Sequence, residues 1–80
     1  MPRKVRELRA ELRRAGFTTD PARGKGSHTY WEHPLLPERA VTLAGGNGDD
    51  AQRYQERQVR DALRDLRETL AGQVEEERHD

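Results

Sequence analysis

The chain has 80 residues, of which 31% are hydrophobic and 38% are charged, and it contains no cysteine. This composition predicts one small domain with a small core and excludes disulfide bonds and a thiolate zinc site. The N-terminus is charged throughout and no apolar run approaches the length of a membrane span, so the sequence predicts a soluble protein of the cytoplasm.

The formal net charge is zero, but the charges are distributed unevenly. Residues 1–25 contain eight Lys and Arg against three Asp and Glu, whereas residues 26–80 contain seven Arg against twelve Asp and Glu. Nucleic-acid-binding domains are commonly basic overall, and this chain is not. On charge alone, the basic N-terminal segment is interpreted more simply as a solvated arginine face than as a binding surface.

The first predicted element is a helix at about residues 3–15. Its apolar residues recur at spacings of three and four, which places Val5, Leu8, Leu12 and Ala15 on one face. Gly16 stands where a left-handed residue ends many helices.

A short extended stretch beginning at Phe17 and a turn, DPARGKG, follow this helix. The next segment, SHTYWEH at residues 27–33, has the aromatic and β-branched composition of a strand. Side chains alternate between the two faces of a strand. One face therefore carries Ser27, Thr29, Trp31 and His33, and the other carries His28, Tyr30 and Glu32.

The segment PLLPER is predicted to connect this strand to a second one, AVTLA, with Val41 and Leu43 on one side. A polar loop then leads to a helix, with Asp49 and Gln52 as an expected capping box. The helix carries an apolar stripe (Val59, Leu63, Leu66 and Leu70) and is expected to end at Gly72. Residues 1–72 form the predicted domain, and the acidic residues 73–80 are expected to be a disordered tail.

The order of elements predicts an α+β fold, α-β-β-β-α, with a three-stranded antiparallel sheet and both helices on one face. In this arrangement Trp31, Val41 and Leu43 face the helices. His28 and Tyr30 then lie on the opposite, more exposed face.

Three segments in this order resemble the HicA (YcfA-like) family of toxin RNases: LRRAGF at residues 12–17, GKGSHTYWEHP at residues 24–34, and VTLAG at residues 41–45. The resemblance covers roughly residues 3–70 and implies a fold similar to the double-stranded RNA-binding domain. It also implies the toxin of a type II toxin–antitoxin system, an mRNA interferase silenced by a HicB-like antitoxin that covers the His28 face. The histidine of the Gly-Ser-His turn, here His28, would be the catalytic residue.

The residues around His28 suit such chemistry independently of the family. An imidazole exchanges a proton near neutral pH, and the 2′-OH of RNA can attack the neighbouring phosphate once a base removes its proton. Gly24 and Gly26 would let the backbone approach a phosphate, and Arg23 and Lys25 would supply positive charge. Ser27 adds a hydroxyl donor, and Tyr30 is a candidate for stacking on a base. No metal or other cofactor is required, so the sequence predicts a metal-independent endoribonuclease.

The other histidines have simpler interpretations. His33, which shares a face with Trp31, is interpreted as a structural residue at the strand end, and His79 as a solvated residue of the tail. A metal site formed by His28 and His33 would need ligands from opposite strand faces, without a Cys to complete it.

Two alternatives remain open at the level of sequence. The same fold could serve as a non-catalytic module that binds structured RNA or a protein partner. A purely structural partner protein would also suit the neutral charge and the long charged helix, but it leaves the GKGSH segment unexplained.

Overall fold

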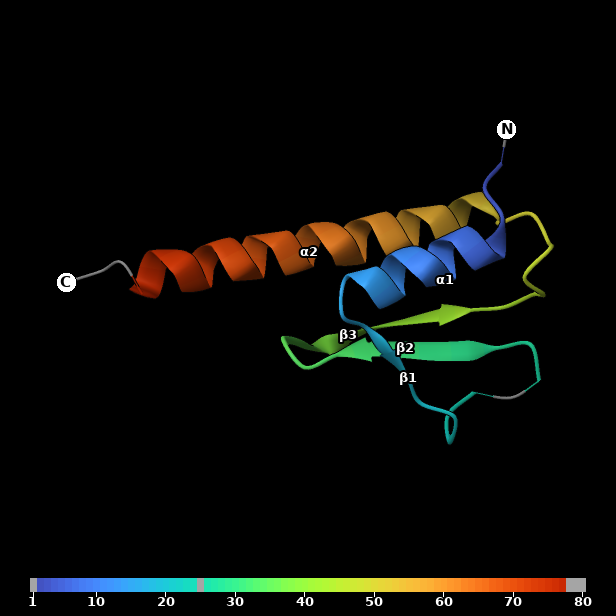
Figure 1. Cartoon of the computed structure of the whole chain (residues 1–80), viewed down its shortest axis with the longest axis horizontal. Coiled ribbons are helices and arrows are strands. Elements are labelled where there is room, and N and C mark those ends of the chain that lie inside the picture. Colours follow the sequence, from blue (N-terminus) through green and yellow to red (C-terminus); the bar gives the residue numbers. More distant parts are fainter. Residues whose placement is uncertain (1, 25, 78–80) are drawn as a thin grey trace.

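The computed structural model describes residues 2–24 and 26–77. Helix α1 (Val5–Arg14) is followed by strands β1 (Thr18–Thr19), β2 (Thr29–His33) and β3 (Leu36–Leu43), and then by helix α2 (Arg53–Glu77). The strands form an antiparallel sheet in the order β1-β2-β3. Both helices lie side by side on one face of the sheet (Figure 1). The predicted α-β-β-β-α fold is therefore confirmed.

The ends of α1 are fixed by local hydrogen bonds. At its start, the backbone N–H of Lys4 donates to the Glu7 carboxylate at 2.8 Å, so the helix begins at Val5 rather than near residue 3. At its end, Gly16 has a φ of +97° and the Phe17 N–H donates to the Leu12 carbonyl at 3.0 Å. This is a Schellman arrangement, which confirms the predicted role of Gly16.

The core lies between the helices and the sheet, and its strand members come from the predicted face. In α2 the prediction was partly wrong, because Leu70 is 43% exposed and Ala62 is buried instead. Trp31, Val41 and Leu43 are each 1% exposed or less. Trp31 pairs with Val41, and Thr29 with Leu43, so the inward-facing residues of β2 and β3 are in register. The helices contribute Val5, Leu8, Leu12, Val59, Ala62 and Leu66, and Phe17 and Ala51 join the core from segments outside the helices and strands.

Strand β3 begins earlier than the sequence predicted. Residues 36–39 were expected to belong to a connection, but His33 pairs with Leu36, which leaves only Pro34 and Leu35 in the turn. Pro37 is compatible with this pairing because β3 is an edge strand, where a missing N–H is tolerated.

The ends of α2 also differ from expectation. The cap is formed by Gln55, whose side-chain oxygen accepts from the Gln52 N–H at 2.9 Å and whose amide donates to the Ala44 carbonyl at 3.0 Å. Asp49 instead accepts from the Gly46 N–H at 2.8 Å and closes the preceding loop. The helix does not end at Gly72, as predicted, but continues to Glu77. Residues 78–80 lie outside the described residues.

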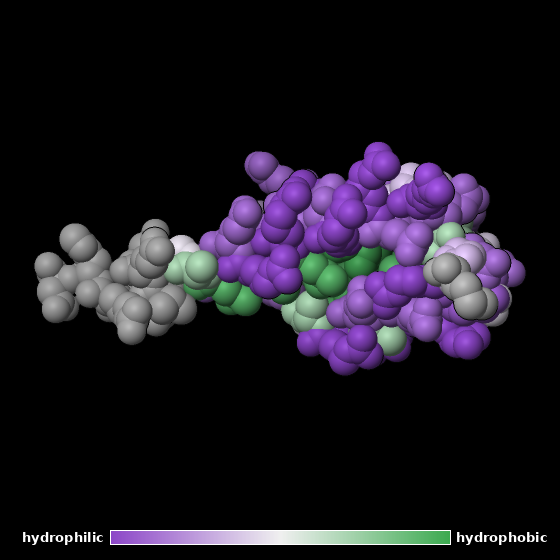
Figure 2. Space-filling view, turned by 90° about the horizontal axis from the view of Figure 1, so that it is seen from above, coloured by the Kyte–Doolittle hydropathy of each residue, from purple (hydrophilic) through white to green (hydrophobic). Residues whose placement is uncertain are grey.

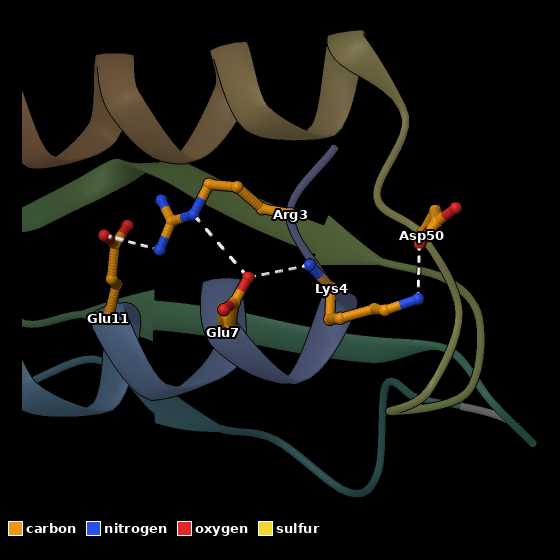
Figure 3. A network of polar contacts seen from close by, with 5 residues as sticks. All are labelled: Arg3, Lys4, Glu7, Glu11 and Asp50. Carbon is orange, nitrogen blue, oxygen red and sulfur yellow. Dashed lines mark hydrogen bonds and ion pairs between the residues drawn. The ribbon is translucent and has the colours of Figure 1, made fainter. Parts of the chain in front are cut away.

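The segment before α1 is bound to the loop between β3 and α2. The Ala51 N–H donates to the Arg3 carbonyl at 2.6 Å, and Lys4 pairs with Asp50 at 2.6 Å. Arg3 also pairs with Glu11 of α1 at 2.8 Å, a hydrogen bond that raises the pKa of the Arg3 guanidinium (Figure 3). These contacts hold the loop against the start of α1.

Seen from the helix side, the surface is mainly hydrophilic, with a hydrophobic strip that extends toward the C-terminal half of α2 (Figure 2). Leu70, on that half, is 43% exposed. Within residues 2–24 and 26–77, no helix is both long enough and apolar enough to cross a membrane.

Candidate functional site

The turn between β1 and β2 is organised by Asp20. Its carboxylate accepts from the Ala22 N–H at 3.0 Å, and its carbonyl accepts from the N–H groups of Arg23 and Gly24 at 3.1 and 3.2 Å. The Asp20 N–H in turn donates to the Tyr30 carbonyl at 2.9 Å. The backbone N–H groups of Ala22, Arg23 and Gly24 are therefore already hydrogen-bonded within the turn.

His28 lies at the end of this turn, directly before β2, and is exposed. Gly24 packs against its backbone: a Cβ at Gly24 would stand 2.7 Å from the His28 carbonyl oxygen. Such a contact is too short for any side chain to be accommodated without a shift of the backbone. The lack of a side chain at Gly24 thus lets the turn pack closely against the backbone of His28, and its approach to a phosphate stays a prediction.

Two of the predicted RNA-binding residues contact each other. The Arg23 guanidinium donates to the Tyr30 hydroxyl at 3.0 Å and lies 5.1 Å from the centre of its ring. This hydrogen bond, with the nearby charges of Asp20 and Glu32, raises the pKa of the Arg23 guanidinium. Both residues line a pocket of about 390 Å³ together with Glu32 and His33.

The remaining predicted residues of the turn lie elsewhere. Gly26, with a φ of +60°, and Ser27 line a different pocket, of about 490 Å³, next to α1. Lys25 lies outside the described residues. The structure therefore divides the predicted set into a group on the Tyr30 side and a group beside α1, and the exposed His28 follows directly after Ser27.

Arg9 of α1 connects the turn to the loop between β3 and α2. Its guanidinium donates to the carbonyls of Ser27 and Gly45 at 2.9 and 2.8 Å, to the Asn47 side chain at 2.5 Å, and to the Thr29 hydroxyl at 3.3 Å. Burial lowers the pKa of this guanidinium, which nevertheless remains charged at neutral pH. One side chain thus holds together three segments that are distant in sequence.

We expect Arg9→Gln to lower the free energy of unfolding by about 1–3 kcal/mol, because several charge-assisted hydrogen bonds are lost in a partly buried site. Arg9→Lys should cost nearly as much, because an ammonium group lacks the planar fork that reaches several acceptors. Urea denaturation measures both values. Arg14→Gln, an exposed change one turn and a half further along α1, is the control and should change stability little. Equal stability of the Arg9 and Arg14 variants would contradict the assigned role of Arg9.

Three arginines that were not predicted as site residues line the pocket beside α1: Arg6, Arg9 and Arg13. Their spacing of three and four is the signal that could have found them, because it places all three along one side of the helix. Arg13 lies 5.5 Å above the ring of Trp31. Some arginines of the basic face of α1 thus contact other parts of the protein, whereas the sequence predicted a face in contact with solvent alone.

His33 has the structural role that was predicted for it. Its Nδ1 accepts from the Leu35 N–H at 3.0 Å, and its ring meets the edge of Phe17 at a centroid distance of 5.1 Å. Among residues 2–24 and 26–77, no group of three or more His, Cys, Asp and Glu side chains is arranged to hold a metal ion.

Comparison with known proteins assigns this arrangement to a family. The family model described as the HicA toxin of bacterial toxin–antitoxin systems matches residues 5–67. No curated protein and no solved structure matches the chain. The matched segment includes α1, the whole sheet and most of α2, and with them the turn that carries His28.

Proposed function

The chain belongs to the HicA toxin family of bacterial toxin–antitoxin systems, and from that premise we propose that it is a metal-independent mRNA endoribonuclease whose one catalytic residue is His28. The observation that carries the proposal is the exposed position of His28 directly after the Gly26–Ser27 turn, which lines a pocket with three arginines. Since the proposed substrate is mRNA, we propose that the protein acts in the cytoplasm.

The proposed reaction is an intramolecular transesterification. The imidazole of His28 removes the proton of the 2′-OH, and the 2′-oxygen forms a bond to the adjacent phosphorus while the bond from phosphorus to the 5′-oxygen breaks. The 5′-oxygen takes up a proton from water as it leaves, and the imidazolium of His28 then returns its proton to solvent. The products are a 2′,3′-cyclic phosphate and a 5′-hydroxyl, and no redox partner is involved.

Positive charge near the phosphate would stabilise the negative charge that develops on its oxygens. Arg6 and Arg13 are exposed cations on the side of α1 that faces the Gly26–Ser27 turn. Arg23 is less suited to this role, because its guanidinium is bound to Tyr30 and Asp20. This assignment differs from the sequence-based one, which relied on Arg23 and Lys25.

The toxin family implies an antitoxin as the partner. We propose that a HicB-like antitoxin covers the turn that carries His28. Because His28 is exposed and the adjacent pocket is open at the surface, a protein bound over residues 26–28 would exclude RNA without any change in the fold.

A non-catalytic RNA-binding module is the second candidate. It is favoured by one observation: His28 is not among the residues that line the arginine pocket. Under this alternative the protein would bind RNA through backbone contacts and leave it intact.

The test is cleavage of RNA by the purified full chain in the presence of EDTA, with analysis of the product ends. We expect cleavage that is insensitive to EDTA and yields 2′,3′-cyclic phosphate ends. Products with 3′-hydroxyl ends, or activity that EDTA abolishes and Mg²⁺ restores, would overturn the proposed mechanism. Binding without cleavage would favour the second candidate.

A further inference from the structure

The pocket beside α1 differs in charge from the other pockets of the surface. Arginines, uncharged polar residues, glycines and Trp31 line it, with no Asp or Glu among them. Each of four other pockets within the described residues contains at least one carboxylate. In a protein of zero net charge, this pocket is a local concentration of positive charge.

The three arginines of this pocket have different roles. Arg9 is engaged by four acceptors and is a structural residue. Arg6 and Arg13 are exposed, and within residues 2–24 and 26–77 neither forms an ion pair with a carboxylate. Their guanidinium groups are available to an external anion.

The spacing of Arg6 and Arg13 suits an extended anion. Seven residues of an α-helix span about 10 Å along its axis, so the two cations lie two turns apart on one side of α1. The pocket also reaches the Gly26–Ser27 turn, which leads directly to His28. A chain of phosphates bound along α1 would therefore reach the turn that precedes His28.

The aromatic residue of the pocket does not offer a stacking surface. Trp31 is 1% exposed, its Nε1–H donates to the Thr29 hydroxyl at 2.9 Å, and Arg13 covers its ring. Proteins that bind single strands through their bases present accessible aromatic rings. This pocket presents cations and hydrogen-bond donors, which recognise the sugar–phosphate backbone and carry no sequence information.

We propose that the pocket beside α1 binds the sugar–phosphate backbone of single-stranded RNA, with Arg6 and Arg13 as the phosphate contacts. The proposal rests on the proposed function for the identity of the polyanion. Under this proposal the pocket positions the substrate, and any preference for particular bases comes from contacts outside the pocket.

The test uses the full chain with His28→Ala, so that RNA stays intact, and a fluorescently labelled single-stranded RNA. The dissociation constant is measured by anisotropy over a series of salt concentrations. Each phosphate contact contributes about 0.7 to the slope of log affinity against log salt. We expect Arg6→Gln with Arg13→Gln to weaken binding and reduce that slope by about 1.4.

Two further variants make the result specific. Arg57→Gln with Arg64→Gln removes the same charge at the same spacing from exposed positions of α2 and should leave the slope nearly unchanged. Arg6→Gln alone should reduce the slope by about 0.7. Because no described contact of the Arg6 side chain is lost, a folding defect would not explain that result.

Equal slopes for the α1 and α2 double variants, or no RNA binding by the His28→Ala chain, would overturn the inference. A larger effect on duplex RNA than on the single strand would overturn the choice of ligand. The two claims can fail independently. If the wild-type chain does not cleave RNA but the α1 variants still show the reduced slope, the proposed function is wrong and the binding site is retained.

Discussion

Replacement of His28 by alanine is expected to lower the rate of RNA cleavage by about 10²–10⁴, the usual contribution of a general acid or base. The free energy of unfolding should stay within about 0.5 kcal/mol of the wild type, because the side chain is exposed. RNA cleavage by the purified protein and urea denaturation measure the two quantities. Retained cleavage by the variant would remove His28 from the mechanism.

His33→Ala is the matched control, because it changes the other histidine of the same segment. This variant loses the acceptor for the Leu35 N–H and the contact with Phe17, so we expect a loss of about 1–2 kcal/mol in stability. Cleavage per folded molecule should remain close to that of the wild type. If both variants lost cleavage only in proportion to the fraction of unfolded protein, the assignment of His28 as the catalytic residue would be contradicted.

Trp31→Ala is expected to lower the free energy of unfolding by about 3–5 kcal/mol, as is usual when a buried aromatic side chain is truncated. A domain of this size has a total stability of about 4–12 kcal/mol, so much of the folded population should be lost. The ring is 1% exposed, and its Nε1–H donates to Thr29. Circular dichroism during heating and urea denaturation measure the loss.

Trp31→Phe and Leu70→Ala are the comparison variants for the stability loss of Trp31→Ala. The phenylalanine retains most of the buried area but loses the hydrogen bond, so we expect a smaller loss than with alanine. Leu70 is 43% exposed, and its truncation should cost less than about 1 kcal/mol. A Trp31→Ala protein as stable as the Leu70→Ala protein would show that the core does not depend on Trp31.

The layers of the fold could be predicted because they follow from local patterns. The apolar spacing in α1 and the alternation around Trp31 each select one buried face, and Gly16 ends the helix as its type suggests. The start of β3 could not be predicted in this way, because Pro37 disfavours a strand until its edge position is known. The cap of α2 depends on Gln55 reaching Ala44, a contact between segments that sequence spacing does not reveal.

The position of the candidate histidine could be predicted, but its surroundings could not. Exposure of His28 follows from the short turn and the parity of β2. The pairing of Arg23 with Tyr30 and the fourfold hydrogen bonding of Arg9 depend on tertiary geometry. The basic face of α1 looked like an ordinary solvated surface because its neighbours in the fold were unknown.

Helical structure and tertiary anchoring end at different points of α2. Its buried residues are Gln55, Val59, Ala62 and Leu66, and none of residues 67–73 is buried, although the helix continues to Glu77. A helical segment without core contacts is held mainly by its own hydrogen bonds and opens at low free-energy cost. Amide protons in the second half of α2 should therefore exchange with solvent through local fraying, whereas those of the first half should require opening of the whole domain.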